Sequence, residues 1–338
     1  MIQLDTGRSA WVWGVAFHPD GRHFLGGGRE QGIRRWRLAN SQEVGEQTGV
    51  TLQAISVSKD HKWIVCGSEE GASVWNEEML EKVIDVEGEN EVLAVDVSPD
   101  STSFATGTSR NSANIWSIRS GERLVGPLKH DSFVTAIQFS PNGEHIATAC
   151  LWDSIRIFDS HTGDELVTIE TNIPNWLSTT PLAWSSNARQ IFVASHGNKI
   201  RSYNISTRSL LAELQIHHDG DPGKVHSIAL AANNKFIATS ADCSIFFLDT
   251  STLTRIGPVI EDGEPLGSIT ISADSSHLAT GRADGKIIIR DLSKILPDSY
   301  GPFHVSIFYD LGISNNPHFV SYGDNYNIGS YPRGSTTR

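Results

Sequence analysis

The sequence has few cysteines, and their spacing gives them no obvious structural pairing. The 338 residues contain 3 cysteines, whose positions match neither a disulfide framework nor a zinc-binding pattern: Cys66, Cys150 and Cys243. So few cysteines, odd in number, favour a reducing compartment. We therefore expect a cytoplasmic or otherwise intracellular protein.

Long apolar segments and a positive charge balance are also missing. No run reaches the roughly 18 apolar residues of a membrane-spanning helix. The N-terminal region carries Asp5 and Arg8 without the continuous apolar core of a secretory signal. With 39 acidic residues against 27 lysines and arginines, the formal charge is −12, which disfavours nucleic acid and anionic membranes as partners. A local basic patch of Arg29, Arg34, Arg35 and Arg37 stays an alternative, but we interpret these residues as solvent-facing positions on a strand.

The sequence lacks motifs for catalysis and for cofactor binding. Gly220–Lys224 is similar to a phosphate-binding loop only superficially, because Val225 stands where Ser or Thr would bind magnesium. The potential metal ligands in His217–Asp221 are adjacent in sequence and have no distant Cys or His pair to complete a set, so we predict a solvated loop. We expect no enzymatic activity, no cofactor and no metal site.

What the sequence does contain is a repeated pattern of short strands. The clearest copy, HDSFVTAIQFSPNGEHIATACLWDSIRIFD at residues 130–159, has three apolar runs separated by turn residues, as antiparallel strands have. Its Ser-Pro-Asn-Gly turn has counterparts marked by an acidic or amide residue at Asp20, Asp60, Asp100, Asn142, Asn187, Asn233 and Asp274. The steps of 40, 40, 42, 45, 46 and 41 residues match those of propeller blades.

On these residues the chain resembles the WD40-repeat β-propellers. Val12–Gly21 (VWGVAFHPDG) and Thr280–Asp291 (TGRADGKIIIRD) fit the repeat almost as well as residues 130–159. The resemblance implies an all-β fold, a seven-bladed propeller of four-stranded antiparallel blades. In this fold Ile2–Leu4 pairs with Ile287–Asp291, closing the ring and removing an exposed sheet edge. A looser similarity is to WD-repeat regions of fungal signalling proteins that carry an NTPase module elsewhere, and these 338 residues contain no such module.

The repeat divides the chain into two predicted parts. Residues 1–293 form the propeller, since blades bury their faces only against neighbouring blades. Residues 294–338 mix aromatic residues with Gly, Ser, Asn and Pro in no regular period, and we predict an irregular, partly disordered tail.

The resemblance also implies a hydrogen-bonded tetrad of His, Ser or Thr, Asp and Trp within a blade. It shares residue types with a catalytic triad, but its role is structural. The tetrad is fragmentary here. His130 and Thr148 fit in blade four with Phe158 at the Trp position, and Thr280 fits in blade seven with Arg290 at the Trp position. We expect apolar packing between blades to provide most of the stability.

Aromatic and arginine side chains fall at strand entries and turns that gather at one rim of the central channel in propellers. These residue types are enriched in binding hot spots. The predicted rim consists of Trp11, Trp13, Arg29, Arg110, Trp152 and Trp176. Each Trp can alternatively pack under its own loop, and this alternative stays open. Trp63 and Trp184 are assigned to strands and to the core.

Two functions fit these features. The first is a non-catalytic scaffold, a monomeric propeller whose rim binds a protein or peptide. The second is a propeller that binds a small ligand or a glycan by stacking Trp faces on sugar rings. Because Trp11, Trp152 and Trp176 do not recur from blade to blade, as a multivalent lectin would need, the scaffold is favoured. The sequence leaves open the identity of the partner, the pathway and whether the chain is part of a larger protein.

Overall fold

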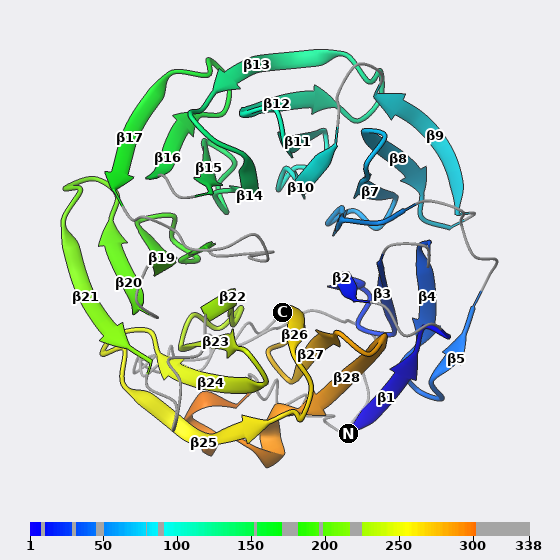
Figure 1. Cartoon of the computed structure of the whole chain (residues 1–338), viewed down its shortest axis with the longest axis vertical. Coiled ribbons are helices and arrows are strands. Elements are labelled where there is room, and N and C mark those ends of the chain that lie inside the picture. The colour runs from blue at the N-terminus through cyan, green and yellow to red at the C-terminus, as the bar shows by residue number, and fades with distance from the viewer. Residues whose placement is uncertain are drawn as a thin grey trace, which may run out of the picture. The chain divides into compact units, whose positions relative to one another are not determined.

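Seven four-stranded antiparallel sheets stand as blades around a central channel (Figure 1). The structure, a computed structural model, describes residues 1–7, 11–28, 32–44, 51–78, 80–86, 91–151, 154–170, 182–195, 199–216 and 225–301. These residues belong to a compact unit that spans Met1–Pro302. The predicted fold class, an all-β propeller of seven four-stranded blades, is confirmed.

The strands of a blade follow one another from the channel outward. Blade one consists of β2 (Val12–Phe17), β3 (His23–Gly28), β4 (Arg34–Arg37) and β5 (Gln42–Glu43). Blade two consists of β6 (Ala54–Val57), β7 (Trp63–Gly67), β8 (Ala72–Asn76) and β9 (Glu81–Val86). Blade three consists of β10 (Val92–Val97), β11 (Ser103–Thr108), β12 (Ser112–Ser117) and β13 (Arg123–Lys129). Blade four consists of β14 (Val134–Phe139), β15 (His145–Cys150), β16 (Ser154–Asp159) and β17 (Glu165–Glu170). Blade five consists of β18 (Leu182–Trp184), β19 (Gln190–Ser195), β20 (Lys199–Asn204) and β21 (Leu210–Gln215). Blade six consists of β22 (Val225–Leu230), β23 (Phe236–Ala241), β24 (Ser244–Asp249) and β25 (Arg255–Glu261), and blade seven of β26 (Leu266–Ile271), β27 (His277–Arg282), β28 (Lys286–Asp291) and β1 (Ile2–Asp5).

The turn between the first and second strands has the same hydrogen bonding in most blades. In blade two, the Ser58 hydroxyl donates to Asp60 Oδ1 at 2.6 Å and accepts the N–H of Trp63 at 2.9 Å. The next residue, His61, has a φ of 64°, a left-handed conformation that the hydrogen bonds of the turn stabilise. The same Ser-to-Asp or Ser-to-Asn bond occurs at Ser98, Ser140, Ser185 and Ser272, which explains why these residues mark the repeat.

The N-terminal strand closes the ring. β1 lies beside β28 in Figure 1, and the register pairs Ile2 with Ile289 and Leu4 with Ile287. Leu4 is buried in the same apolar cluster as Ile287 and Ile289. Pairing β1 with β28 covers the edge of blade seven, so the predicted ring closure is confirmed.

Small residues at the end of each second strand let neighbouring blades approach. A side chain at Gly67 or Gly107 would clash, because a Cβ there would lie 2.8 Å from the Val92 carbonyl oxygen or 2.9 Å from that of Val134. Both valines begin the innermost strand of the following blade. The equivalent positions in the other blades are Gly27, Ala149, Ala194, Ser240 and Gly281. Close packing between blades therefore depends on small residues at this position.

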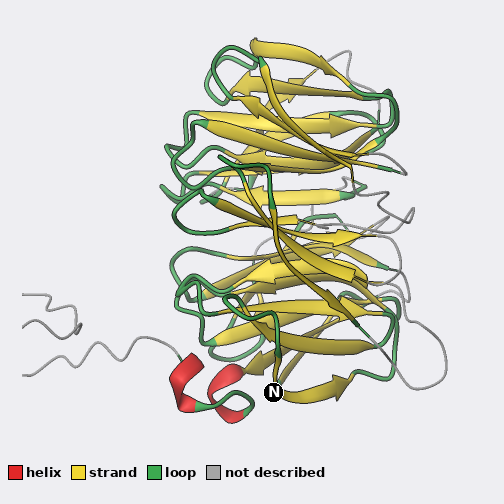
Figure 2. Cartoon of the chain, turned by 90° about the vertical axis from the view of Figure 1, so that its left-hand side faces the viewer, coloured by secondary structure: helices red, strands yellow, loops and turns green. Residues whose placement is uncertain are grey.

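Two short helices follow the last strand, η1 (Leu292–Lys294) and η2 (Asp298–Tyr300), drawn in red in Figure 2. The Tyr300 hydroxyl donates to Asp249 Oδ2 at 2.7 Å, and the Lys235 ammonium donates to the Ser299 carbonyl at 3.0 Å. Leu292 and Leu296 are buried in the cluster between blades six and seven. The segment up to residue 301 thus packs on blade six, while residues 302–338 lie outside the described residues. The domain boundary at residue 293 stays a prediction.

Candidate binding surface at the channel mouth

The ring has two faces that differ in composition. We call the upper face the end at which each innermost strand begins and the second strand turns into the third. The lower face is the opposite end, where turns such as Ser58–Asp60 join the first and second strands. Trp11 directly precedes β2, and Arg110 lies in the turn from β11 to β12, so both belong to the upper face.

Trp11 and Trp13 form a stacked pair on the upper face. Their ring centroids are 5.5 Å apart and their planes differ by 20°. Trp11 also lies against blade seven, where a Cβ on Gly267 would come within 3.2 Å of the indole. Both side chains are half-buried. Trp11 is thus partly a packing residue over the seam between blades one and seven, a contact with a neighbouring blade and not with its own loop.

A β-bulge directs Trp13 toward the channel. The register between β2 and β3 shifts between Val12 and Gly14, so Trp13 is the extra residue, and bulges commonly redirect a side chain in this way. Trp13 borders a cavity of about 70 Å³ in the upper channel, together with Gln53 from blade two and Ser268 from blade seven. An aromatic side chain therefore stands at the upper mouth of the channel.

The other predicted rim residues divide into two groups. Arg110 is exposed on the upper face, and its N–H donates to the Thr108 hydroxyl at 3.2 Å. Arg29, Trp152 and Trp176 lie outside the described residues, as does the polar loop at 217–224. The rim as a set of six therefore stays a prediction, and the structure brings together only Trp11 and Trp13 among the residues it describes.

The two tryptophans assigned to the core both lie in strands. Trp184 is 4% exposed, and its indole N–H donates to the Gln138 carbonyl of blade four at 3.2 Å. Trp63 is half-buried and packs against the cluster between blades two and three. Neither belongs to the upper rim.

Fragments of the tetrad hold individual blades together. The His130 imidazole is buried, with Nε2 at 2.8 Å from the Thr148 hydroxyl, and Phe158 packs edge-on against it at 5.5 Å. In blade three, the Trp116 indole donates to the Thr106 hydroxyl at 3.0 Å. The first contact joins the segment before β14 to β15, and the second joins β12 to β11, so each lies within one blade, which fits a structural role.

Blade seven replaces the tetrad with ion pairs. Asp262, whose side chain is 2% exposed, occupies the place that the histidine has in blade four, four residues before the innermost strand. Arg290 stands at the Trp position and donates to the Thr280 hydroxyl at 3.0 Å and to Asp262 at 2.8 Å. Arg282 pairs with both Asp262 and Asp284. Sequence reasoning identified Thr280 and Arg290 but missed Asp262, which its spacing from β26 would have revealed.

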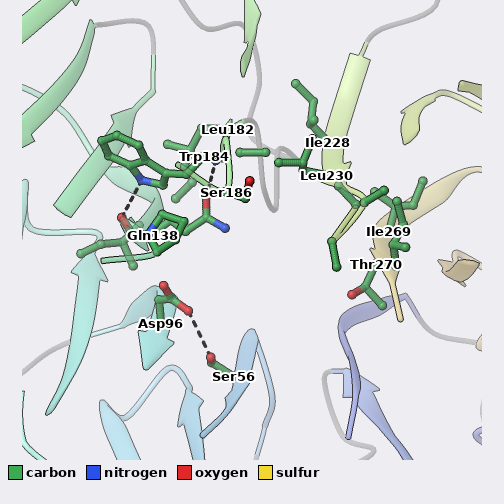
Figure 3. Close-up of a pocket in the computed structure, with 18 of the residues that line it drawn as sticks. Ser56, Asp96, Gln138, Leu182, Trp184, Ser186, Ile228, Leu230, Ile269 and Thr270 are labelled. Atoms are coloured by element: carbon green, nitrogen blue, oxygen red, sulfur yellow. Dashed lines mark hydrogen bonds between the residues drawn. The ribbon is translucent and has the colours of Figure 1, made fainter. Parts of the chain in front are cut away.

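A polar arc lines one side of the lower channel (Figure 3). The Ser56 hydroxyl of blade two donates to Asp96 Oδ1 of blade three at 3.2 Å. Asp96 Oδ2 accepts the Phe139 N–H of blade four at 2.8 Å, and Gln138 Oε1 accepts the Trp184 N–H of blade five at 3.3 Å. Burial raises the pKa of Asp96 to about 6, although its hydrogen bonds oppose this rise. Sequence reasoning missed this arc because an alternating strand pattern does not show which positions face the channel.

Among the described residues, one cluster of histidine and acidic side chains has potential metal-ligand atoms that all lie within 4.8 Å of one another. It consists of His18, Asp20 and His23. Asp20 Oδ1 accepts the N–H groups of Arg22 and His23 at 2.7 and 3.0 Å, and Oδ2 lies 2.6 Å from His23 Nδ1. The Asp20 N–H donates to His18 Nδ1 at 3.2 Å. Because these bonds engage both Asp20 oxygens and the Nδ1 atom of each histidine, we interpret the cluster as the stabilised turn of blade one.

Comparison with protein families agrees with the repeat. The WD40 family model, described as WD domain, G-beta repeat, matches residues 2–37, 81–117, 123–159 and 208–249. Among the described residues, no helix is long and apolar enough to cross a membrane.

The curated relatives differ in how much of their length the chain covers. The chain is 28% identical over 210 residues to autophagy-related protein 16 of Arabidopsis thaliana, covering 60% of this chain and 40% of that protein. It is 24% identical over 256 residues to eukaryotic translation initiation factor 3 subunit I of Aspergillus terreus, covering 72% and 74%. It is 31% identical over 176 residues to small ribosomal subunit protein RACK1 of Drosophila melanogaster, covering 49% and 54%. The chain thus spans less than two thirds of the first and the third of these relatives.

Proposed function

We propose that this seven-bladed propeller, which the WD40 family model matches in four places, is a non-catalytic scaffold that binds a protein or peptide segment on its upper rim. The observation that carries this proposal is the stacked pair of Trp11 and Trp13 at the channel mouth. Both indoles stay half-exposed on a rigid frame of strands, and a bulge directs Trp13 toward the channel. Rigid, partly exposed aromatic side chains are typical anchors of protein interfaces.

The relatives support a role in assemblies. Two of them carry names that place them in larger complexes, a subunit of a translation initiation factor and a protein of the small ribosomal subunit. We infer by analogy that this chain also works as one part of a complex, inside the cell and in the cytoplasm. The propeller itself is proposed to be monomeric, because its closed ring covers the edge that β1 would otherwise leave open.

The charge of the chain supports a protein partner over nucleic acid or an anionic membrane. With a formal charge of −12, the molecule repels polyanions at neutral pH. The tryptophans alone would also suit a sugar ring, but Trp11 already lies against Gly267 and Trp13, which leaves less of its face for stacking. A glycan array separates these two possibilities, since robust binding of one glycan would favour the ligand-binding propeller.

Affinity capture with alanine variants tests the scaffold proposal. The full chain serves as bait in a cell extract, and captured proteins are quantified by mass spectrometry. We expect Trp13→Ala and Arg110→Ala each to reduce recovery of the same partner about tenfold, because truncating a buried anchor weakens an interface by this order.

The matched control is Leu211→Ala, an exposed apolar residue on the outer strand β21. It should leave recovery unchanged, and far-UV circular dichroism should be the same for all variants. Equal recovery by wild type and a correctly folded Trp13→Ala variant would refute the rim assignment.

A further inference from the structure

The lower half of the channel forms a second cavity, of about 400 Å³. Its wall consists of innermost strands from blades two to seven, and it reaches turn residues Pro141, Ser186 and Ala232. Because these turns belong to the lower face, the cavity lies at the end of the ring opposite the stacked tryptophans. Its size falls in the range of pockets that hold small ligands or single side chains.

The wall of this cavity is polar on one side and mostly apolar on the other. Figure 3 shows Ser56, Asp96 and Gln138 on one side, and Ile228, Leu230 and Ile269 across the cavity. At the channel positions equivalent to the polar residues, blades five and six have only Ala183 and Ala229, and blade seven has Thr270, labelled beside Ile269 in Figure 3. The small alanines leave space, and the half-buried Leu230 offers an apolar surface beside it, whereas Ile228 and Ile269 are buried in the clusters between blades. An occupant that fits both sides must therefore be amphipathic.

Asp96 is the acidic group on this wall. Its oxygens accept hydrogen bonds from the Ser56 hydroxyl and the Phe139 N–H, and a carboxylate can accept about four such bonds, so acceptor capacity remains. Among the described residues no lysine or arginine forms an ion pair with it, and the charge that acts on it is Lys59, in the turn of blade two. A partly desolvated carboxylate without a close counter-ion favours a cation that can reach it.

The turns of the surrounding lower face carry charges of both signs. Four turns of the lower face carry a carboxyl group at the equivalent position, namely Asp20, Asp60, Asp100 and Asp274. Burial tends to raise the pKa of each carboxyl group, but hydrogen bonds within the turn outweigh burial and hold the pKa below its usual value. These groups are therefore ionised at neutral pH, beside the basic side chains of the same turns, Arg22, Lys59, Lys62, Arg189 and Lys235. The preference for a cation thus depends on Asp96 itself.

We propose that the lower channel is a second binding site, which takes the side chain of a lysine presented by a protein partner. The ammonium group donates to Asp96 on the polar side, and the aliphatic stem lies along Ala229 and Leu230. A lysine suits this site because it combines a compact charge that donates three hydrogen bonds with a four-carbon apolar stem. The site goes beyond the proposed upper rim, since neither Trp11 nor Trp13 lines it.

Binding at this site should depend on pH. The ammonium pairs with ionised Asp96, and the raised pKa of about 6 means that the carboxyl group becomes protonated in mildly acidic solution. The Ser56 hydroxyl and the backbone N–H groups of Phe139 and Val97, which contact Asp96, do not titrate in this range. Affinity for the lysine side chain should therefore fall as the pH drops from 7.5 to 5.

Ligand-observed NMR on the full chain tests the proposal with a defined probe, the capped pentapeptide Gly-Ala-Lys-Ala-Gly. Its isostere with norleucine in place of lysine keeps the stem and removes the ammonium. We expect the lysine peptide to bind at least tenfold more tightly than the norleucine peptide. Asp96→Asn should abolish this difference, and Ala229→Leu, which fills the cavity from the other side, should weaken binding while leaving Asp96 in place.

The matched control is Asp85→Asn on the outer strand β9, which changes the net charge by the same amount and should leave binding unchanged. Trp13→Ala should also leave it unchanged, so failure of the upper-rim proposal is distinguishable from failure of this one. Melting temperatures check that every variant folds. Equal binding of both peptides, no binding of either, or an Asp96→Asn variant that binds the lysine peptide as wild type does would each overturn the proposal.

Discussion

Several side chains in this propeller act between blades, where each sheet alone could not satisfy them. Asp96 is the clearest case, because it belongs to blade three and accepts hydrogen bonds from blades two and four. Gln138 does the same between blades four and five. The cost of burying these polar groups is offset only while neighbouring blades stay in register. They therefore fix the position of one blade against the next and shape the channel wall at the same time.

Replacing Asp96 should change how stability depends on pH. Its pKa of about 6 in the folded chain lies above the unfolded value, so the stabilising contribution is present below about pH 4 and is lost as pH rises through 6. From pH 5 to pH 8 the wild type should lose about 1.4 kcal/mol through this group. Asp96→Asn keeps an acceptor for the Phe139 N–H and does not titrate, so the variant should gain stability relative to wild type by that amount over this range.

Urea denaturation of both proteins at pH 5 and pH 8 measures this difference. Other titrating groups are common to the two chains and cancel in the comparison. A difference in unfolding free energy that is the same at both pH values would show that Asp96 does not titrate in this range.

Sequence reasoning at the residue scale succeeded where a role depends on the residue's own blade. The contact of His130 with Thr148 followed from the repeat, as did the placement of Trp184 in the core. It was wrong for Arg34 and Arg35, which pair with Glu43 and Glu77 and are 9% and 13% exposed, instead of facing solvent. Such partners lie on other strands or in the next blade, so a strand pattern does not reveal them.

At the scale of elements, the turns within blades and the strand that closes the ring were the most predictable parts of the molecule. A Ser-x-Asp turn is read directly from sequence, because its hydrogen bonds join residues that are neighbours along the chain. The pairing of β1 with β28 joins the two ends of the ring and was predictable only through the resemblance to propellers. η1 and η2 were not predicted, because their anchors, such as the bond from Tyr300 to Asp249, connect residues far apart in sequence.

The closing strand should contribute strongly to stability. Leu4 is 2% exposed in the cluster between blades seven and one, so Leu4→Ala removes buried apolar volume where the ring closes. We expect this variant to lose about 3 kcal/mol of unfolding free energy. Gln3→Ala, on the exposed side of the same strand, should lose less than about 0.5 kcal/mol.

Urea titrations followed by tryptophan fluorescence provide both values. If Leu4→Ala and Gln3→Ala behave alike, then β1 does not close the ring through its buried side chain. An unchanged denaturant slope would show that the loss reflects stability and not a different folded state.

At the scale of the whole molecule, a closed ring leaves two chemically different mouths free for recognition. The upper mouth carries the stacked tryptophans, and the lower mouth carries a cavity with a carboxyl group and a surrounding set of ionised turn residues. The backbone groups of the seven sheets are engaged in ladders that a closed ring completes. The propeller therefore serves as a rigid frame on which binding side chains are displayed, and this is the physical basis for proposing a scaffold.

Site-directed photocrosslinking is the most direct test of that proposal. A benzophenone amino acid replaces Trp13 in one protein and Leu211 on the outer strand in another, and both are irradiated in a cell extract. The account predicts a discrete crosslinked partner from position 13 that excess unlabelled wild-type chain removes by competition, and none from position 211. Crosslinking of the same partner from position 211 but not from position 13 would contradict it.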